Sequence, residues 1–235
     1  MPTRPPEQDA KRAALARVEV CSALSAAELD SLAGLAQLRR LPKGRTLVKQ
    51  GDISEAVFGV VSGRLRVSVS RADGSEATLT LLGPGELLGE LGLFQDSSRS
   101  AHVTALEDAR VLVIGKSVFL GALRRSPAAS LALCGLLAAR VRQLARHFEE
   151  VTALPVEQRL ARKLVLLTAR WGAPTTAGVG ISLKLSQQEL AELVDTSRQT
   201  ANKCLTKWRK AGILSAATRG VVVLDVDALR RCAGA

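Results

Sequence analysis

Residues 187–206 read QQELAELVDTSRQTANKCLT, and this stretch decides how the C-terminal part of the chain folds. Small Ala191 and Ala201 lie where two short helices would cross closely. Asp195 stands between them, and Asp tolerates the left-handed backbone of a tight turn better than most residues. The residues that would face inward are apolar: Leu190, Leu193 and Val194. The segment therefore predicts a helix-turn-helix.

Serines mark the start of both helices. Ser186 has Glu189 three residues later, which is the spacing of a capping box, and Ser197 caps the second helix. Gly212 ends that helix. The next stretch, ILSAATRGVVVL, predicts a hairpin that turns at residues 218–220.

The second helix carries a polar outer face. Spacing by three and four residues places four side chains that can donate to a base edge or a phosphate on this face: Arg198, Gln199, Asn202 and Lys203. Taken alone, this is also the pattern of an ordinary solvated helix. From Leu154 onward, however, the chain has 13 Lys and Arg against 6 Asp and Glu, and Arg219 sits at the hairpin tip. A nucleic-acid partner is favoured.

Length and composition bound the remaining possibilities. A chain of 235 residues with 47% hydrophobic and 23% charged residues is typical of a globular protein with one large domain or two ordinary ones. Its net charge is +11. The longest uncharged apolar run, Leu131–Ala139, is far shorter than the roughly 18 residues of a membrane span, and charges interrupt the N-terminal region where a signal peptide would be apolar. We expect a cytoplasmic protein with no membrane segment.

Several chemistries find no support in the sequence. There is no Tyr, no paired nucleophile and base, no metal-ligand spacing and no Walker-type phosphate loop, so an enzyme is disfavoured. The four cysteines lie far apart without a C-x-x-C pair: Cys21, Cys134, Cys204 and Cys232. This excludes the usual zinc and iron–sulfur patterns and predicts reduced, mostly buried thiols.

Upstream of the helices, the hydrophobic period changes to two. From Thr46 to about Ile114, short alternating stretches separated by glycines predict an antiparallel sandwich or barrel, with a hairpin at residues 71–75. A helix precedes this region, because Ser25 and Glu28 have capping-box spacing. Three leucines follow on one face of that helix: Leu29, Leu32 and Leu35.

Within the strand region, residues 89–101 read GELGLFQDSSRSA. Backbone amides near Gly89 and Leu91 with the Arg99 guanidinium suit a phosphate, and the Glu90 carboxylate suits a ribose hydroxyl. Ser100 follows Arg99 directly. The plainer alternative is a surface ion pair between Glu90 and Arg99.

A long helix follows the strands. Its apolar positions step alternately by three and four, as in a heptad seam: Cys134, Leu137, Val141, Leu144, Phe148 and Val151. The seam is shorter than that of a typical coiled coil, so two interpretations are possible: a helix that forms a dimer interface, or a helix packed on its own domain. We favour the dimer helix. Since Pro155 interrupts helices, we expect a flexible tail at 1–18, a β domain at 19–127, the dimerisation helix at 128–153 and a DNA-binding domain at 154–235.

From about Val20 onward the sequence resembles the cyclic-AMP receptor protein and FNR family of bacterial transcription regulators. The residues that carry the resemblance are the pairs Gly51-Asp52 and Gly85-Glu86, Val61 with Gly63, residues 89–101, and TSRQT at 196–200. It implies an α+β fold made of a cyclic-nucleotide-binding β-roll (jelly roll), a long dimerisation helix and a winged helix-turn-helix.

The resemblance also implies roles for residues. Glu90 would hold the ribose 2′-hydroxyl of the allosteric ligand, cyclic AMP, while Arg99 and Ser100, assisted by amides near Gly89 and Leu91, would hold its phosphate. Arg198, Gln199 and Lys203 would read bases in a palindromic double-stranded operator. We assign Gln188, Ser197, Thr200 and Arg219 to DNA phosphates. RNA polymerase is a further partner if the homodimer is an activator.

The long helix departs from the family pattern. The cyclic-AMP receptor recognises adenine with a Thr-Ser pair, and Leu144 and Ala145 stand at the aligned positions, where neither can hydrogen-bond a base. Gln143, Arg142 and Arg146 are polar alternatives nearby. A regulator that senses cyclic di-GMP or needs no ligand therefore stays open, as does a nucleotide-binding scaffold without DNA function. Neither an iron–sulfur cluster nor haem is expected, because Cys21 is the only N-terminal cysteine and only two histidines occur.

Overall fold

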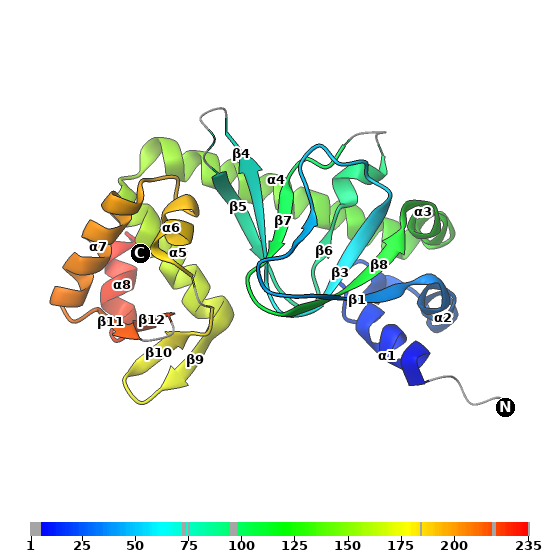
Figure 1. Cartoon of the computed structure of the whole chain (residues 1–235), viewed down its shortest axis with the longest axis horizontal. Helices are drawn as coiled ribbons and strands as arrows, with labels where there is room; N and C mark the ends of the chain where they lie inside the picture. Colours follow the sequence, from blue (N-terminus) through cyan, green and yellow to red (C-terminus); the bar gives the residue numbers. More distant parts are fainter. Residues whose placement is uncertain are drawn as a thin grey trace. The chain divides into compact units, whose positions relative to one another are not determined.

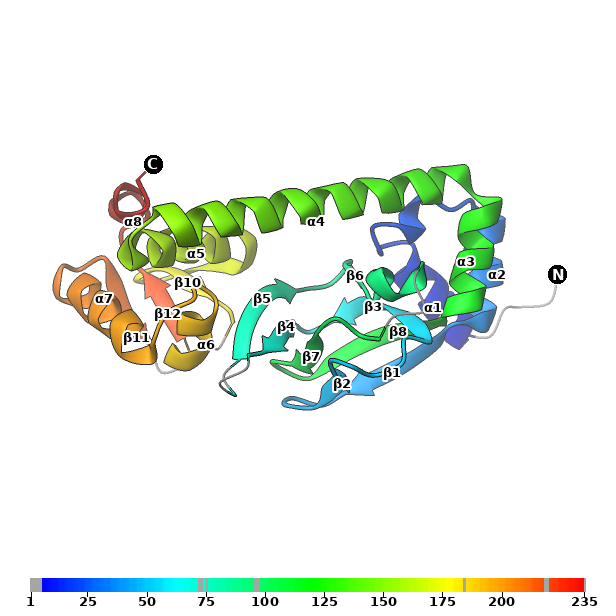
Figure 2. The ribbon, with the colours of Figure 1, turned by 90° about the horizontal axis from the view of Figure 1, so that it is seen from above.

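In the computed structural model, residues 6–71, 74, 76–94, 98–183, 185–217 and 220–234 are described, without the side chains of 216 and 217. The chain divides into two compact units, residues 1–142 and 143–235. The division falls inside helix α4 (Pro127–Ala153), which Figure 2 shows as one long helix.

Two antiparallel sheets form the centre of the N-terminal unit (Figure 1). One sheet has the order β1-β8-β3-β6 and the other β2-β7-β4-β5. Their strands are β1 (Gln37–Leu41), β2 (Thr46–Val48), β3 (Ala56–Ser62), β4 (Leu65–Ser70), β5 (Glu76–Leu82), β6 (Leu87–Leu88), β7 (His102–Ala105) and β8 (Ala109–Gly115). β4 and β5 pair from Ser70 and Glu76 outward and so form a hairpin. Residues 72, 73 and 75 of the turn predicted at 71–75 lie outside the described residues.

The core of this unit has two parts. Between the sheets lie buried residues such as Phe58, Leu65 and Val111. Helices cover the outer side of β8 with a second cluster, which includes Leu112, Ile114 and Phe119. These helices are α1 (Pro6–Leu15), α2 (Ala26–Leu35), α3 (Lys116–Arg125) and the start of α4, with short 3₁₀ turns at η1 (Cys21–Ala23) and η2 (Glu90–Leu93).

The expected flexible tail at residues 1–18 is wrong for residues 6–18. α1 occupies Pro6–Leu15, and both Leu15 and Val18 are fully buried in the helical cluster. Arg12 also pairs with Asp30 of α2 at 2.6 Å. The segment is polar because one face of α1 is solvated, while a few apolar residues suffice to dock it.

Two details differ from the expectations for α2 and the cysteines. Ser25 and Glu28 form the capping box, but of the three leucines Leu35 stays 60% exposed. Cys21 is buried, and burial raises the pKa of its thiol to about 12. Cys134 is exposed, so the thiols are not mostly buried.

The C-terminal unit packs helices on a small sheet with the order β11-β12-β10-β9. Its elements are α5 (Val156–Trp171), β9 (Gly172–Thr175), β10 (Gly178–Ile181), α6 (Gln187–Glu192), α7 (Arg198–Lys210), β11 (Leu214–Ala217), β12 (Gly220–Val223) and α8 (Val226–Cys232). β11 and β12 form the expected hairpin; Thr218 and Arg219 at its turn lie outside the described residues.

β9 and β10 form a further antiparallel hairpin, in which Gly172 pairs with Ile181. Gly172 and Gly178 permit it, because a Cβ atom at Gly172 would lie 2.2 Å from the Thr168 carbonyl oxygen, and one at Gly178 would lie 2.3 Å from that of Val223. The glycines therefore allow β9 and β10 to approach their neighbours closely.

Candidate nucleotide site and DNA-binding surface

The turn that begins the GELGLF sequence depends on a glycine. Gly89 has φ +86°, in the left-handed region, and directly precedes η2. A Cβ atom there would lie 2.5 Å from Nη1 of Arg99. Only glycine fits both the backbone angle and the nearby guanidinium.

Glu90 lies almost completely buried behind this turn, with 1% of its surface exposed. Arg140 of α4 donates one hydrogen bond to its Oε1 atom and another to the Leu87 carbonyl oxygen. Oε2 has no hydrogen-bond partner among the described residues. A buried carboxylate oxygen without a partner is costly, so this atom is suited to accept from a hydroxyl group that enters the site.

Arg99 is the second buried charge of the site. Its Nη2 donates to the Ala56 carbonyl oxygen at 2.7 Å, and the guanidinium lies 5.2 Å from the ring centre of Phe58. Nε has no partner within the described part of the chain. Burial lowers the pKa of Arg99, while the nearby carboxylates of Asp52 and Glu90 act in the opposite direction. An anion bound here would offset the cost of the buried cation.

The structure thus brings Gly89, Glu90 and Arg99 together, while Leu91 and Ser100 lie on the exposed side of the same segment. Arg140 joins them and was not predicted. It lies 50 residues from Glu90, and nothing in local spacing marks it among the other arginines of the helix.

The helix-turn-helix forms as predicted. Both serine caps are present: Ser186 forms a capping box with Glu189, and Ser197 accepts from the Thr200 amide. Asp195 has φ +56°, the only positive φ of a non-glycine residue in the described ranges. The interior residues are buried: Leu190, Ala191, Leu193, Val194 and Ala201.

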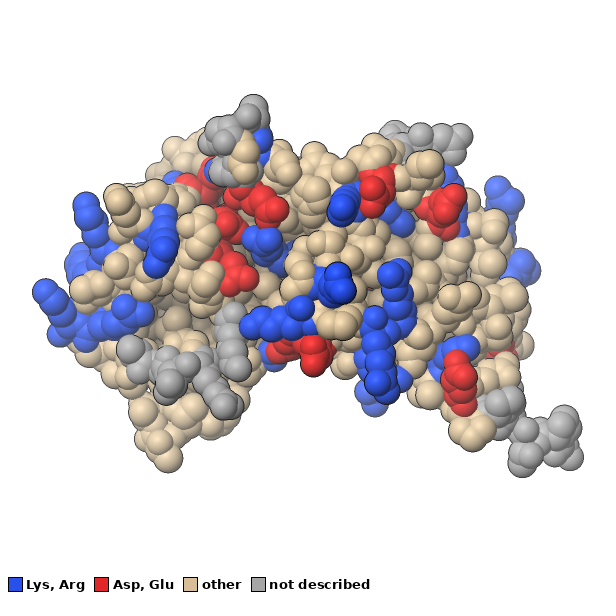
Figure 3. Space-filling model, viewed as in Figure 1, with Lys and Arg blue, Asp and Glu red and all other residues tan. Residues whose placement is uncertain are grey.

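The outer face of α7 is exposed at the predicted base-reading residues Arg198, Gln199 and Lys203. Gln188 is also exposed and donates to Glu192. Lys and Arg gather over the part of the surface that α7 forms (Figure 3). Arg219, predicted to contact phosphate, lies outside the described residues.

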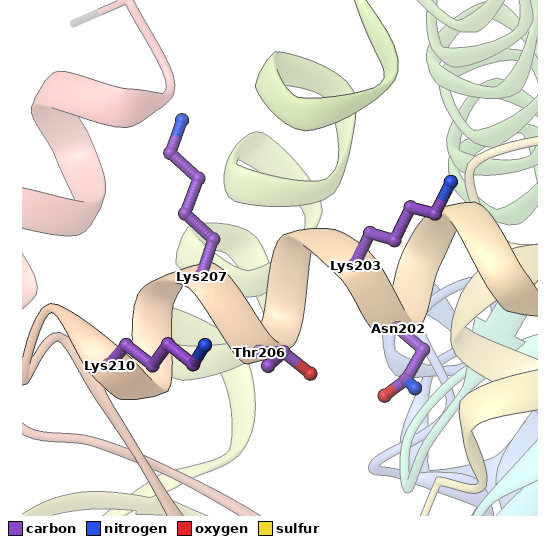
Figure 4. Close-up of a pocket in the computed structure, with 5 residues that line it drawn as sticks. All are labelled: Asn202, Lys203, Thr206, Lys207 and Lys210. Carbon is purple, nitrogen blue, oxygen red and sulfur yellow. The ribbon is translucent and has the colours of Figure 1, made fainter.

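A shallow hollow of about 440 Å³ follows the same helix, and Figure 4 shows the side chains that line it. Lys203 is a predicted base-reading residue and Asn202 belongs to the predicted outer face, whereas Thr206, Lys207 and Lys210 were not predicted. Asn202 accepts a hydrogen bond from Gln187 at 3.0 Å. Lys207 is held by Glu157 at 2.8 Å, which raises the pKa of the lysine. The hollow therefore combines cationic and amide groups, as a nucleic-acid backbone and its bases require.

Arg159 of α5 supports the turn of the motif. Its guanidinium donates to four backbone carbonyls, those of Val151 and Leu154 at the end of α4 and those of Val194 and Asp195 at the turn. All four distances are 3.1 Å. Arg159 thereby ties the end of α4 to the helix-turn-helix within the C-terminal unit.

The N-terminal unit is a sandwich with a buried acid–arginine site, and the C-terminal unit is a helix-turn-helix with a basic outer face, a combination typical of DNA-binding proteins. The comparison with known families agrees: the cyclic nucleotide-binding domain matches residues 38–126, and the Crp-like helix-turn-helix domain matches residues 158–232. The chain belongs to the CRP/FNR family, and it is a DNA-binding transcription regulator with a cyclic nucleotide-binding domain, not an enzyme.

Relatives support this over nearly the whole length. The chain is 31% identical to a cyclic AMP receptor protein of Thermus thermophilus, over 89% of this chain and 94% of the relative. It is 26% identical to a CRP-like cAMP-activated global transcriptional regulator of Mycobacterium tuberculosis, over 92% and 97%. Among solved structures, the c-di-GMP responsive regulator CLP of Xanthomonas campestris superimposes with a TM-score of 0.75 at 25% identity, covering 86% of this chain and all of that one.

Proposed function

We propose that the protein is a cytoplasmic homodimer whose operator binding is controlled by cyclic AMP held in the N-terminal unit. The observation that carries the ligand site is the pair of buried, incompletely satisfied polar groups, Glu90 Oε2 and Arg99 Nε. A cyclic nucleotide supplies the matching chemistry, since its ribose hydroxyl can donate and its phosphate can accept. The names of the two curated relatives point to the same nucleotide.

In this proposal, Glu90 holds the ribose 2′-hydroxyl, and Arg99 and Ser100 hold the phosphate with help from amides near Gly89 and Leu91. Arg140 belongs to α4 and bonds to Glu90, so a ligand that binds at Glu90 also affects the long helix. The ligand activates the protein only to the extent that it binds the DNA-binding conformation more tightly than the inactive one.

The dimer interface that we propose is the exposed apolar face of α4. Val141, Leu144 and Phe148 are each at least 64% exposed, and Cys134 is exposed as well. Half-buried Leu137, which packs partly against the helical core cluster, and half-buried Val151 continue the seam. By length and composition alone, α4 also qualifies as a membrane span, with mean hydropathy 1.3 in its most apolar window. The Arg140–Glu90 pair and the charges towards its C-terminus favour protein packing instead.

On DNA, we assign base reading to Arg198, Gln199 and Lys203. Gln188, Ser197, Thr200 and Arg219 contact phosphates and set the position of α7 in the major groove. The exposure of Arg198, Gln199 and Lys203 supports this assignment. If the regulator is an activator, RNA polymerase is a further partner.

Thermal unfolding with cyclic AMP, cyclic GMP and cyclic di-GMP tests the ligand. At a hundred times its dissociation constant, a ligand that binds only the folded protein adds about 2.7 kcal/mol of stability. We expect cyclic AMP to raise the melting temperature, and Arg99→Ala to remove most of the increase because the phosphate loses its charged partner. A wild-type increase in Arg99→Ala would place the site elsewhere.

Cyclic di-GMP is the second candidate. Leu144 and Ala145 offer no hydrogen bond to an adenine, and the structural relative CLP is described as responsive to cyclic di-GMP. A melting increase with cyclic di-GMP alone would favour this candidate. No increase with any nucleotide, together with operator binding, would indicate a regulator that is active without ligand.

A further inference from the structure

His102, the first residue of β7, lies three positions after Arg99 and has hydrogen-bond partners at both ring nitrogens. Nδ1 is 3.1 Å from the backbone nitrogen of Gln50, and Nε2 is 3.0 Å from Oγ of Ser70. Gln50 closes the network, because its Oε1 atom accepts from the Ser70 amide at 3.0 Å. The ring therefore joins β7 to the turn at residues 49–52 and to the end of β4.

These contacts fit one tautomer of the neutral ring. A backbone N–H group can only donate, so Nδ1 must be an unprotonated acceptor. The neutral ring then carries its proton on Nε2 and donates it to Ser70 Oγ. A protonated ring would direct an N–H group at Nδ1 against the Gln50 N–H group, and two donors cannot share a hydrogen bond.

The turn that His102 holds is also bonded to the backbone of Arg99. The Gly51 amide donates to the Arg99 carbonyl oxygen at 2.9 Å, and the Arg99 amide donates to the Asp52 carbonyl oxygen at 2.7 Å. Within the turn, Asp52 Oδ2 accepts from the Lys49 amide at 2.9 Å. The position of the Arg99 backbone thus depends on the turn, and the turn depends on His102.

We propose that neutral His102 is a positioning residue for Arg99, and that its protonation releases the 49–52 turn and weakens anion binding at Arg99. The consequence for ligand affinity rests on the function proposed above. Affinity for a cyclic nucleotide should therefore be lower when the His102 ring is protonated.

The charged neighbours of this network do not explain such a dependence. The charged residues on the elements that the network joins are Lys49 and Asp52 in the turn, Arg66 and Arg71 on and after β4, and Glu76 of β5, which pairs with Arg66 at 2.7 Å. Side chains of these types keep their charge between about pH 7.5 and pH 5.5. His147, the other histidine, lies in the C-terminal unit and supplies a matched control.

Amide hydrogen exchange of the ligand-free, full-length protein tests the positioning role without any ligand. Relative to intrinsic exchange, we expect the amides of Gly51 and Arg99 to lose about threefold to tenfold of their protection between about pH 7.5 and pH 5.5, the scale of one solvent-accessible hydrogen bond. His102→Gln should abolish this pH dependence, and His147→Gln should retain it. Unchanged wild-type protection, or an unchanged dependence in His102→Gln, would overturn the proposal.

Binding of cyclic AMP supplies the second readout. We expect the wild-type dissociation constant to increase about threefold to tenfold over the same pH interval, and that of His102→Gln to stay constant. His102→Phe, which cannot accept from Gln50, should bind weakly at both values. If the wild-type protein binds no cyclic nucleotide at about pH 7.5, the proposed ligand fails, while hydrogen exchange still decides the role of His102.

Discussion

The Glu90 carboxylate is buried in the N-terminal unit, and the Arg140 guanidinium stabilises it. Glu90 is 1% exposed, and in the described part of the chain its Oε1 atom accepts a hydrogen bond from Arg140 while Oε2 has no partner. Arg140→Ala should therefore destabilise this unit by about 2 to 4 kcal/mol, since a buried carboxylate loses its cation. Urea denaturation measures the change. Arg142→Ala, two residues further along and exposed, is the control, and an equal loss in both variants would contradict the role of the pair.

We expect His147 to give the stability of the C-terminal unit its own pH dependence. Burial lowers the pKa of His147, and Lys163 lowers it further, while Glu150 and Asp195 oppose the change. The unfolded chain therefore takes up the proton more readily than the folded one. This contribution to stability is complete above about pH 6.5 and is lost as the pH falls below that value. Thermal denaturation measures this loss, and His147→Gln should reduce the decrease of the melting temperature as the pH falls. If the melting temperature of the variant decreases as steeply as that of the wild-type protein, another group is responsible.

The exposed apolar face of α4 is the dimer interface that we propose. Leu144→Glu would bury a carboxylate on both copies of a dimer interface, so we expect dissociation or unfolding. Light scattering reports the mass. Ala139→Glu adds the same charge at an exposed position outside the seam and should leave a dimer intact. A dimer that survives Leu144→Glu would place the interface on another face.

Across the whole molecule, two copies of α7 should read a palindromic site, with half-sites separated by about 34 to 36 Å, one turn of DNA. Arg198→Ala should cost about 1 to 3 kcal/mol at its own base pair, because Arg forms two hydrogen bonds with guanine. Arg219→Ala should weaken binding to all sequences alike and flatten the salt dependence. Selection from a random DNA library measures both effects, and a non-palindromic site or unchanged preference in Arg198→Ala would refute the assignment.

The sequence by itself determined the local features of this regulator. Capping boxes, the left-handed turn at Asp195, alternating strands and the 89–101 segment all act over a few residues, so their spacing is visible in the chain. The order of these segments also sufficed to recognise the family.

Only the tertiary structure decided which distant groups meet. Arg140 reaches Glu90 across 50 residues, Arg159 reaches the turn across 36, and His102 reaches Gln50 across 52. The docking of α1 likewise depends on a few apolar side chains finding a complementary core. Such contacts arise from packing between elements, where hydrogen-bond geometry and burial, rather than spacing along the chain, select the partners.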